Sequence, residues 1–131
     1  MVIDTSAILA LLLGEPEAAA MAKALSEDNM RLVGAPTLVE AAAVMLNRKG
    51  NAGEVALDAL LQRADITVVE MTPAAADSAR DAYARYGKGV GTPPVLNYGD
   101  CLAYGVAMAL GQPLLFKGSD FASTDVPAVP Y

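Results

Sequence analysis

The sequence predicts an α/β fold in which helices cover both faces of a mainly parallel sheet of four to five strands. The chain has 131 residues, which fits one domain, and we expect residues 1–131 to form a single domain without internal repeats. Predicted strands alternate with predicted helices. The strands are continuous apolar runs without polar alternation, a pattern typical of a parallel sheet that is buried on both sides.

Each predicted strand is a short apolar segment. The third is dense in β-branched residues, which favour extended backbone. The predicted strands are residues 1–3, 31–33, 66–69 and 114–116, with a short fifth at 126–129.

Glycine and proline set the boundaries of the predicted helices. Gly14 stops the first helix, Pro16 fits the first turn of the second, and Gly50 ends the third. Three glycines and two prolines make residues 87–96 a loop. The predicted helices are residues 7–13, 15–27, 36–49, 53–64, 73–86 and 97–110.

The absence of histidine excludes several kinds of active site. The chain has no His, so it has no His general base, no Ser–His or Cys–His pair and no His-containing zinc site. If the protein is a hydrolase, a metal-bound water is the expected nucleophile. The single cysteine, Cys101, forms no internal disulfide and fits a reducing cytoplasm, and we expect it to be a small buried residue.

Charge and hydropathy bear on the partners of the chain. The longest apolar run, residues 7–13, is far shorter than the roughly 20 residues of a membrane-spanning helix, so we expect a cytoplasmic protein. The net charge of −6 is unusual for a nucleic-acid enzyme. Five acids form a candidate metal cluster: Asp4, Glu40, Asp100, Asp120 and Asp125. When they are set aside, the chain has ten acidic and nine basic residues. Bound cations would invert the potential of such a cluster.

Four carboxylates are expected to meet at one edge of the sheet. Asp4 ends the first strand, Glu40 lies one turn into the helix after the second, Asp100 opens the helix that leads to the fourth, and Asp120 follows the fourth. Functional crevices of open α/β sheets lie beyond the carboxyl ends of the strands. Carboxylates gathered there would repel one another, and a divalent cation with its preference for oxygen ligands would relieve the repulsion.

Each of these acids also has a purely structural interpretation. Thr37 and Glu40 have the spacing of a capping box, and Asn97 with Asp100 offers a similar N-terminal cap. Asp4 would cap its own helix. Taken singly, these interpretations account for the residues, but they do not predict that the acids converge.

Motifs spread over the whole chain resemble those of the PIN-domain ribonucleases, specifically the VapC toxins of bacterial VapBC toxin–antitoxin pairs. The set of motifs is far more specific than any one of them. They are VIDTSA at 2–7, TLVE at 37–40, LNYGDC at 96–101, PLLFKGSDF at 113–121 and TD at 124–125.

The resemblance implies a three-layer α/β/α PIN-like fold and an Mg²⁺- or Mn²⁺-dependent endoribonuclease. It also implies a homodimer, inhibition by a VapB-type antitoxin, and contact with DNA only through that antitoxin. Asp4, Glu40, Asp100 and Asp120 match the acidic positions of the family and are expected to be catalytic metal ligands. Asp125 is a further candidate. It would either bind the metal or contact the metal ligands without touching the ion itself.

The mechanism that we expect uses metal-activated water for in-line attack on the RNA phosphodiester, leaving 5′-phosphate and 3′-hydroxyl ends. Phosphate contacts would come from Lys117, Arg85 and Lys88, although basic residues near helix ends also complement the helix dipole. Tyr86 and Tyr98 would either stack on bases or pack in the core.

Several questions stay open at the level of sequence. Ser6 would contribute a hydroxyl to the metal site or simply cap the first helix, and it stands where an aspartate-nucleophile phosphatase would carry a second acid. A non-catalytic interaction protein with the same fold is a third possibility. Transfer RNA or another structured RNA is the expected substrate, and the number of metal ions is not fixed. Apolar surface between Pro16 and Ala64 would form a dimer face and a groove for an antitoxin helix.

Overall fold

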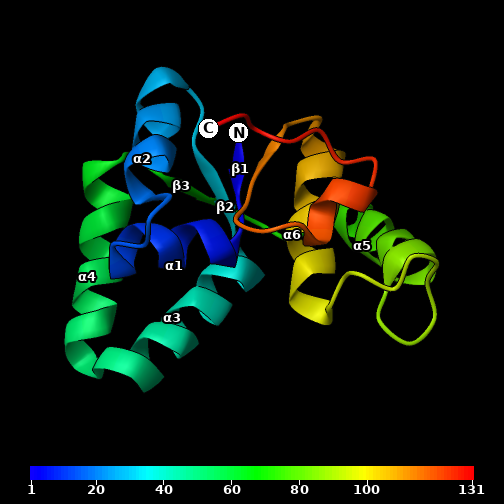
Figure 1. Cartoon of the computed structure of the whole chain (residues 1–131), viewed down its shortest axis with the longest axis horizontal. Coiled ribbons are helices and arrows are strands. Elements are labelled where there is room, and N and C mark those ends of the chain that lie inside the picture. Colours follow the sequence, from blue (N-terminus) through cyan, green and yellow to red (C-terminus); the bar gives the residue numbers. More distant parts are fainter.

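A four-stranded parallel sheet forms the centre of the molecule (Figure 1). We describe residues 1–131 from a computed structural model. The strand order is β3-β2-β1-β4, and every neighbouring pair is parallel, which confirms the predicted parallel sheet. The strands are β1 (Val2–Ile3), β2 (Leu32–Gly34), β3 (Thr67–Val69) and β4 (Leu114–Leu115).

Six α-helices cover the two faces of this sheet. Helices α1 to α4 lie on one side of β1 in Figure 1, and α5 and α6 lie on the other, which gives the expected three layers. None of the helices is long and apolar enough to span a membrane. The helices are α1 (Thr5–Leu13), α2 (Ala18–Glu27), α3 (Ala35–Lys49), α4 (Asn51–Arg63), α5 (Pro73–Tyr86) and α6 (Tyr98–Leu110), with a 3₁₀ turn η1 at Asp120–Ser123.

Some helix boundaries differ from the predicted ones. Helix α1 begins at Thr5, two residues earlier than predicted, because the Asp4 side chain accepts a hydrogen bond from the Ser6 backbone and caps the helix there. Helix α3 follows β2 without a loop, since Gly34 both ends the strand and precedes the helix. The carboxyl end of β2 is thereby joined directly to the helix that carries Glu40.

The predicted fifth strand is reduced to a single parallel bridge between Leu114 and Ala128. Leu114 donates to the Pro127 carbonyl at 2.8 Å and accepts from the Val129 backbone at 2.9 Å. Pro127 and Pro130 have no N–H to donate, so the segment cannot continue as a regular strand. The prediction of a short strand over 126–129 was therefore wrong in extent, although the segment does pair with β4.

The hydrophobic core consists of two clusters, one against each face of the sheet. Residues of α5 and α6, including the fully buried Tyr104, pack on one face. Ile3, Ile8 and Met21 belong to the cluster on the other face. Burial of both faces explains why the strands are apolar without alternation.

Helices α5 and α6 approach closely at Gly105. A Cβ atom at this position would lie 2.3 Å from the Ala75 carbonyl oxygen and 2.8 Å from the Ala79 Cβ. Gly105→Ala is therefore expected to lower the free energy of unfolding by about 1–3 kcal/mol, measured by urea denaturation. Ala109→Ser, at an exposed position of the same helix, is the control and should shift the midpoint little. Equal midpoints for the two variants would contradict the close packing.

Candidate active site

Asp4 lies directly after β1 and is almost entirely buried, with 4% of its surface exposed. Its Oδ2 accepts hydrogen bonds from the Ser6 backbone at 2.9 Å and from the Ser6 hydroxyl at 2.5 Å. The same hydroxyl accepts a bond of 2.9 Å from the Lys117 backbone, which ties the end of β1 to the segment after β4. Burial raises the pKa of Asp4, and the bonds from Ser6 oppose that shift only in part.

Asp100 lies in the first turn of α6 and forms a capping box with Asn97. The Asn97 backbone donates to the Asp100 carboxylate at 2.8 Å, and the Asp100 backbone donates to the Asn97 side chain at 2.8 Å. The structural interpretation of this pair is thus correct. Burial, and after it the negative charges of Asp4 and Asp120, nevertheless raise the pKa of Asp100 to about 6.

Glu40 does not take part in a capping box. Helix α3 begins at Ala35, so Thr37 lies inside its first turn, and no side chain caps this helix. The Glu40 carboxylate instead lies against Gly99 at the start of α6, where a Cβ would come within 2.9 Å of its Oε1. Burial raises the pKa of Glu40, and the charge of Asp100 adds to the effect.

The four acids therefore come from distant parts of the sequence to one edge of the sheet. The Glu40 charge raises the pKa of Asp4, and the charges of Asp4 and Asp120 raise that of Asp100. Asp120 is exposed and opens η1, directly beyond β4. In their present rotamers no three of these carboxylates are close enough to hold one ion. The acids are neighbours that would have to turn inward around a cation.

The chemistry of these donors fits a hard divalent cation. All are oxygen ligands, and nothing cationic lies deep enough to balance the buried charge of Asp4. The Thr5 hydroxyl is buried beside them without a hydrogen bond of good geometry, although it lies near enough to Glu40 to lower the pKa of that carboxyl. A buried polar atom without a partner is unusual in a folded protein. A bound ligand or an ordered water would supply the missing hydrogen bond of the Thr5 hydroxyl.

Gly99 allows α3 and α6 to bring their acids together. Because a Cβ at this position would overlap the Glu40 carboxylate, Gly99→Ala is expected to push Glu40 away from Asp100 and lower metal-dependent activity by roughly 10- to 100-fold. The measurement is the rate of RNA cleavage, together with Mn²⁺ affinity by calorimetry. Gly53→Ala, which would crowd the Met45 backbone between α3 and α4, is the control for a crowded glycine and should leave the Mn²⁺ affinity unchanged. Unchanged Mn²⁺ affinity in Gly99→Ala would contradict this role.

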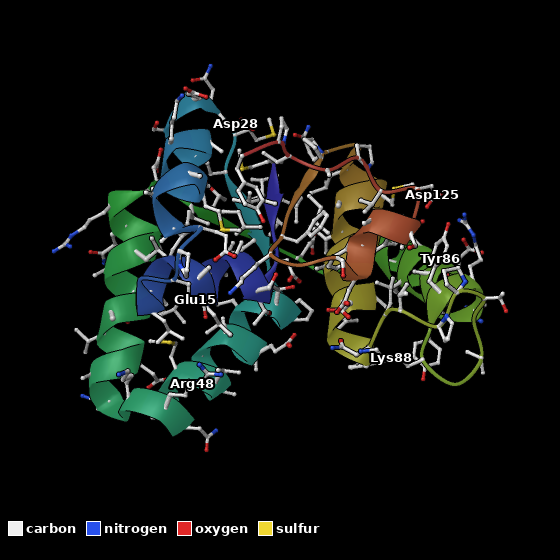
Figure 2. The ribbon with its side chains drawn as sticks, in the orientation of Figure 1. Glu15, Asp28, Arg48, Tyr86, Lys88 and Asp125 are labelled. Atoms are coloured by element: carbon white, nitrogen blue, oxygen red, sulfur yellow. The ribbon has the colours of Figure 1, made fainter.

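Asp125 is held in a separate set of contacts. It accepts hydrogen bonds from the Tyr104 hydroxyl at 2.6 Å and from Arg85 at 2.9 Å, and these bonds lower its pKa. Arg85 also pairs with Asp81 at 3.2 Å and lies 4.7 Å above the Tyr86 ring. Figure 2 shows Asp125 and Tyr86 together at the C-terminal end of α5. The structure thus joins Asp125 to Arg85 and does not bring either to the four acids.

The remaining basic candidates differ in their availability to RNA. Lys117 is ion-paired with Glu15 and with Glu17, the latter at 3.5 Å. Lys88 is exposed, forms no ion pair, and lies near enough to Asp100 for its charge to lower the pKa of that carboxyl. In Figure 2 Lys88 lies beside the N-terminal end of α6. Lys88 is therefore the one cation of the three that is free and adjacent to the acids.

The aromatic and thiol candidates differ in their exposure to solvent. Tyr86 is buried and packs against Tyr104, whereas Tyr98 is 73% exposed at the first position of α6. Cys101 is buried, as expected, and burial raises the pKa of its thiol to about 11. A thiol with that pKa is protonated at neutral pH and is a poor nucleophile.

Three features of the site were not found from the sequence. The packing of Glu40 on Gly99 and the pairing of Lys117 with Glu15 join residues that are far apart in the chain. The orphaned Thr5 hydroxyl follows a motif aspartate, but its lack of a partner is visible only in three dimensions. A glycine immediately before Asp100 was the single available signal for a close approach of backbone.

Comparison with known proteins finds matches in one family. The model of the PIN domain family matches residues 1–127. "Ribonuclease VapC" of Mycolicibacterium smegmatis is 46% identical, over 98% of this chain and 99% of the relative. "Ribonuclease VapC30" of Mycobacterium tuberculosis is also 46% identical, over 98% of each.

Two solved structures share the fold at low sequence identity. Mycobacterium tuberculosis VapC20, described as a Sarcin-Ricin loop cleaving toxin, has a TM-score of 0.75 and 17% identity, with 95% of both chains covered. Rickettsia felis VapBC2, bound to a DNA fragment from its promoter, has a TM-score of 0.76 and 13% identity, covering 98% of this chain and 96% of that one. The full-length match of sequence and fold confirms the resemblance seen in the motifs: the chain belongs to the PIN-domain family and, within it, to the VapC ribonucleases.

Proposed function

We propose that this protein is a metal-dependent endoribonuclease, the toxin of a type II toxin–antitoxin system. The observation that carries the proposal is the gathering of Asp4, Glu40, Asp100 and Asp120 at one sheet edge, with the pKa values of the first three raised. Carboxylates that lie close together resist ionisation, and a divalent cation bound between them would stabilise their ionised form. The family supplies RNA as the substrate class.

The four acids would hold Mg²⁺ or Mn²⁺, and the bound ion would lower the pKa of a water and neutralise charge on the phosphate under attack. The residues of the chain prepare this site. Ser6 holds the Oδ2 atom of Asp4 through two hydrogen bonds. Gly99 lets Glu40 approach α6, and Asp100 must lose its proton, with a pKa of about 6, to become a ligand. We assign Asp125 to support of the C-terminal segment through Tyr104, and not to the metal.

RNA would reach the acids on the side of the loop over residues 87–96. Lys88 is the cation best placed to bind a phosphate there, because it has no carboxylate partner. Lys117 and Arg85, which the sequence also suggested, would have to exchange their carboxylate partners for phosphate. We propose a structured RNA such as transfer RNA as the substrate, cleaved in an unpaired segment.

The antitoxin is expected to bind between α1, α2 and α4. These helices enclose an apolar groove of about 490 Å³ whose walls include Leu11, Leu25 and Leu60 and whose rim carries Arg31 and Arg63. An amphipathic helix or extended segment of a VapB-type partner with acidic side chains would suit this lining. DNA would be bound only through the antitoxin. We further propose that the protein acts in the cytoplasm as a homodimer.

The test is cleavage of total transfer RNA by purified protein with Mg²⁺ or Mn²⁺ and with EDTA. Cleavage should require the metal and leave 5′-phosphate and 3′-hydroxyl ends, identified by sequencing of the new 5′ ends. Asp58→Asn, an exposed acid on α4 away from the sheet edge, is the matched control and should cleave normally. Cleavage that persists in EDTA, or a covalent phosphoenzyme, would refute the metal mechanism.

A further inference from the structure

One unpaired lysine and one exposed aromatic ring lie near the N-terminal end of α6, which carries Asp100. Of the nine basic residues only four form no ion pair, and Lys88 is the one among them that lies beside the N-terminal end of α6, with its carbonyl hydrogen-bonded to Tyr83 (Figure 2). The other three are Arg48, Lys49 and Arg63, at the C-terminal ends of α3 and α4. Tyr98 is the most exposed of the large apolar and aromatic side chains of the chain, at 73%. The Lys88 ammonium and the Tyr98 hydroxyl form no hydrogen bond or ion pair within the chain.

The position of Tyr98 is fixed by the residues that follow it. It is the first residue of α6, and the next residue, Gly99, lies against the Glu40 carboxylate. Asp100, one residue further, forms the capping box with Asn97, so the start of this helix cannot rotate without breaking two hydrogen bonds. The ring is therefore presented from a rigid support immediately beside two of the proposed metal ligands.

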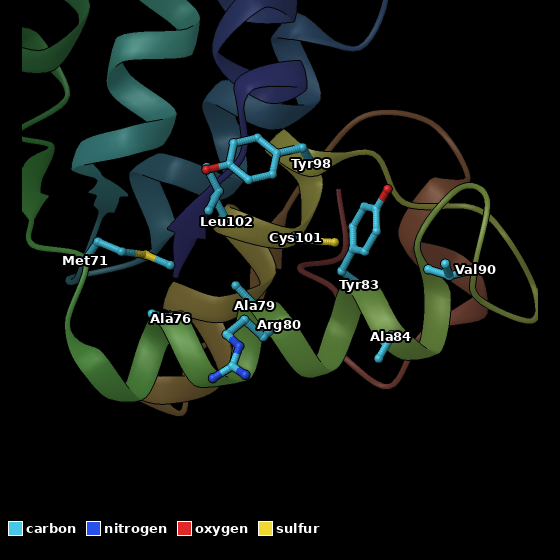
Figure 3. Close-up of a pocket in the computed structure, with 10 residues that line it drawn as sticks. All are labelled: Met71, Ala76, Ala79, Arg80, Tyr83, Ala84, Val90, Tyr98, Cys101 and Leu102. Carbon is cyan, nitrogen blue, oxygen red and sulfur yellow. The ribbon is translucent and has the colours of Figure 1, made fainter.

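Tyr98 also lines an apolar groove of about 750 Å³ between α5 and α6. Figure 3 shows its ring above Leu102, with Tyr83 rising from α5 on the far side of Cys101. Tyr98 lines the groove, and its neighbour Gly99 lies against the Glu40 carboxylate, so Tyr98 is one of the groove residues next in sequence to the acid site. An RNA segment that lay in this groove would contact the Tyr98 ring.

Lys88 is held near the same groove by its backbone. Its N–H donates to the Leu96 carbonyl at 2.8 Å, and its carbonyl accepts a hydrogen bond from the Tyr83 hydroxyl at 3.2 Å. These bonds fix the Cα while leaving the ammonium group free.

We propose that Tyr98 and Lys88 form a nucleotide subsite next to the scissile phosphate. The base of an unpaired nucleotide stacks on the Tyr98 ring, and Lys88 binds a phosphate of the same segment. Every base has a face that can stack, whereas a base within an A-form helix does not expose that face, so the subsite selects unpaired RNA. This inference rests on the proposed function and deepens it, since it names the two residues that bind the unpaired nucleotide beside the cleavage site.

The test measures binding separately from cleavage. In an Asp4→Asn background, which prevents turnover, fluorescence anisotropy gives the Kd of a labelled single-stranded oligoribonucleotide. Adding Tyr98→Ala should weaken binding roughly tenfold, while Tyr98→Phe, which keeps the ring, should bind within about twofold of the parent. Adding Lys88→Ala should weaken binding and reduce the slope of log Kd against log salt by about 0.7, the value for one contact to a single strand.

Matched controls lie elsewhere on the surface. Tyr131→Ala removes another exposed aromatic ring, near α2, and Lys49→Ala removes another unpaired lysine, at the end of α3. Neither should change the Kd. A double-stranded version of the oligonucleotide should bind Tyr98→Ala and the parent equally, because it offers no free base face.

Three results would overturn the subsite. Equal affinity of Tyr98→Ala and the parent for the single strand, with normal metal-dependent cleavage by Tyr98→Ala in the wild-type background, would refute it and leave the proposed function standing. A change in molar mass by light scattering, without a change in RNA affinity, would assign the Tyr98 face to contact with a second copy of the chain. A lower melting temperature alone would assign the ring to packing on Leu102. If the wild-type protein neither cleaves nor binds RNA, both the subsite and the proposed function are refuted.

Discussion

Asp4→Asn should abolish metal-dependent RNA cleavage and at the same time stabilise the metal-free protein. The expected loss of rate is roughly 100-fold or more, because substitutions even behind metal ligands cost 10- to 100-fold. The expected gain in melting temperature near pH 7.5 is about 3 °C or more. Both effects have one cause, since the Asp4 carboxylate is buried beside Glu40 without a cation to balance it.

The Asp4→Asn substitution should leave the fold intact. An asparagine oxygen can accept both hydrogen bonds from Ser6, so the cap of α1 remains. Ser6→Ala is the informative companion, because it leaves the charge of Asp4 and removes the bond from its hydroxyl; it should lower activity without stabilising the protein. Melting curves in EDTA and cleavage rates in Mn²⁺ give the two readouts. An Asp4→Asn variant that is less stable than wild type would mean that the carboxylate serves the fold and not a cation.

The fold could be predicted from the sequence because its signals are local and repeated. Continuous apolar strands and the glycines and prolines between the helices were enough for the parallel sheet and the order of elements. The errors occurred where a single contact decides a boundary. Asp4 starts α1 two residues early, and Pro127 reduces the last strand to one bridge. Neither change follows from hydrophobic periodicity.

The meeting of the acids could be predicted because it depends on topology, as the carboxyl ends of parallel strands share one edge. The state of the basic residues could not. Lys117 pairs with Glu15, 102 positions earlier in the chain, and Arg85 pairs with Asp125, 40 positions later. Three lysine and arginine candidates that looked alike in the sequence therefore differ in the structure, where Lys88 alone is free.

The stability of the metal-free protein should increase as the pH falls from about 7.5 to 4.5. The pKa of Asp100 is about 6 in the folded protein against 3.8 for an ordinary aspartate, so between these values the folded state binds more protons than the unfolded state. The stabilisation is complete below about 3.8 and is lost as the pH rises through about 6. Asp4 and Glu40, whose pKa values are also raised, act in the same direction.

Asp28 and Asp125 limit this trend at the acid end. Hydrogen bonds lower their pKa values, so the stability that they contribute is present above the ordinary value of 3.8 and lost as the pH falls below it. The melting temperature measured in EDTA should therefore pass through a maximum near pH 4–5, within the window set by these two groups and by Asp100. Asp100→Asn should flatten the limb between about pH 5 and 7.

A bound divalent cation should reverse the direction of this dependence. Ligand carboxylates must be ionised, so affinity for Mn²⁺ rises as the pH passes through about 6, where Asp100 loses its proton. Stabilisation by a ligand grows with the ratio of its concentration to its Kd. The curve in millimolar Mn²⁺ should thus rise with pH where the curve in EDTA falls, and Asp100→Asn should reduce both slopes together, with Asp4 and Glu40 responsible for what remains. Parallel curves for wild type with and without Mn²⁺ would show that the ion binds away from these acids, because only binding at the acids links its affinity to their protons.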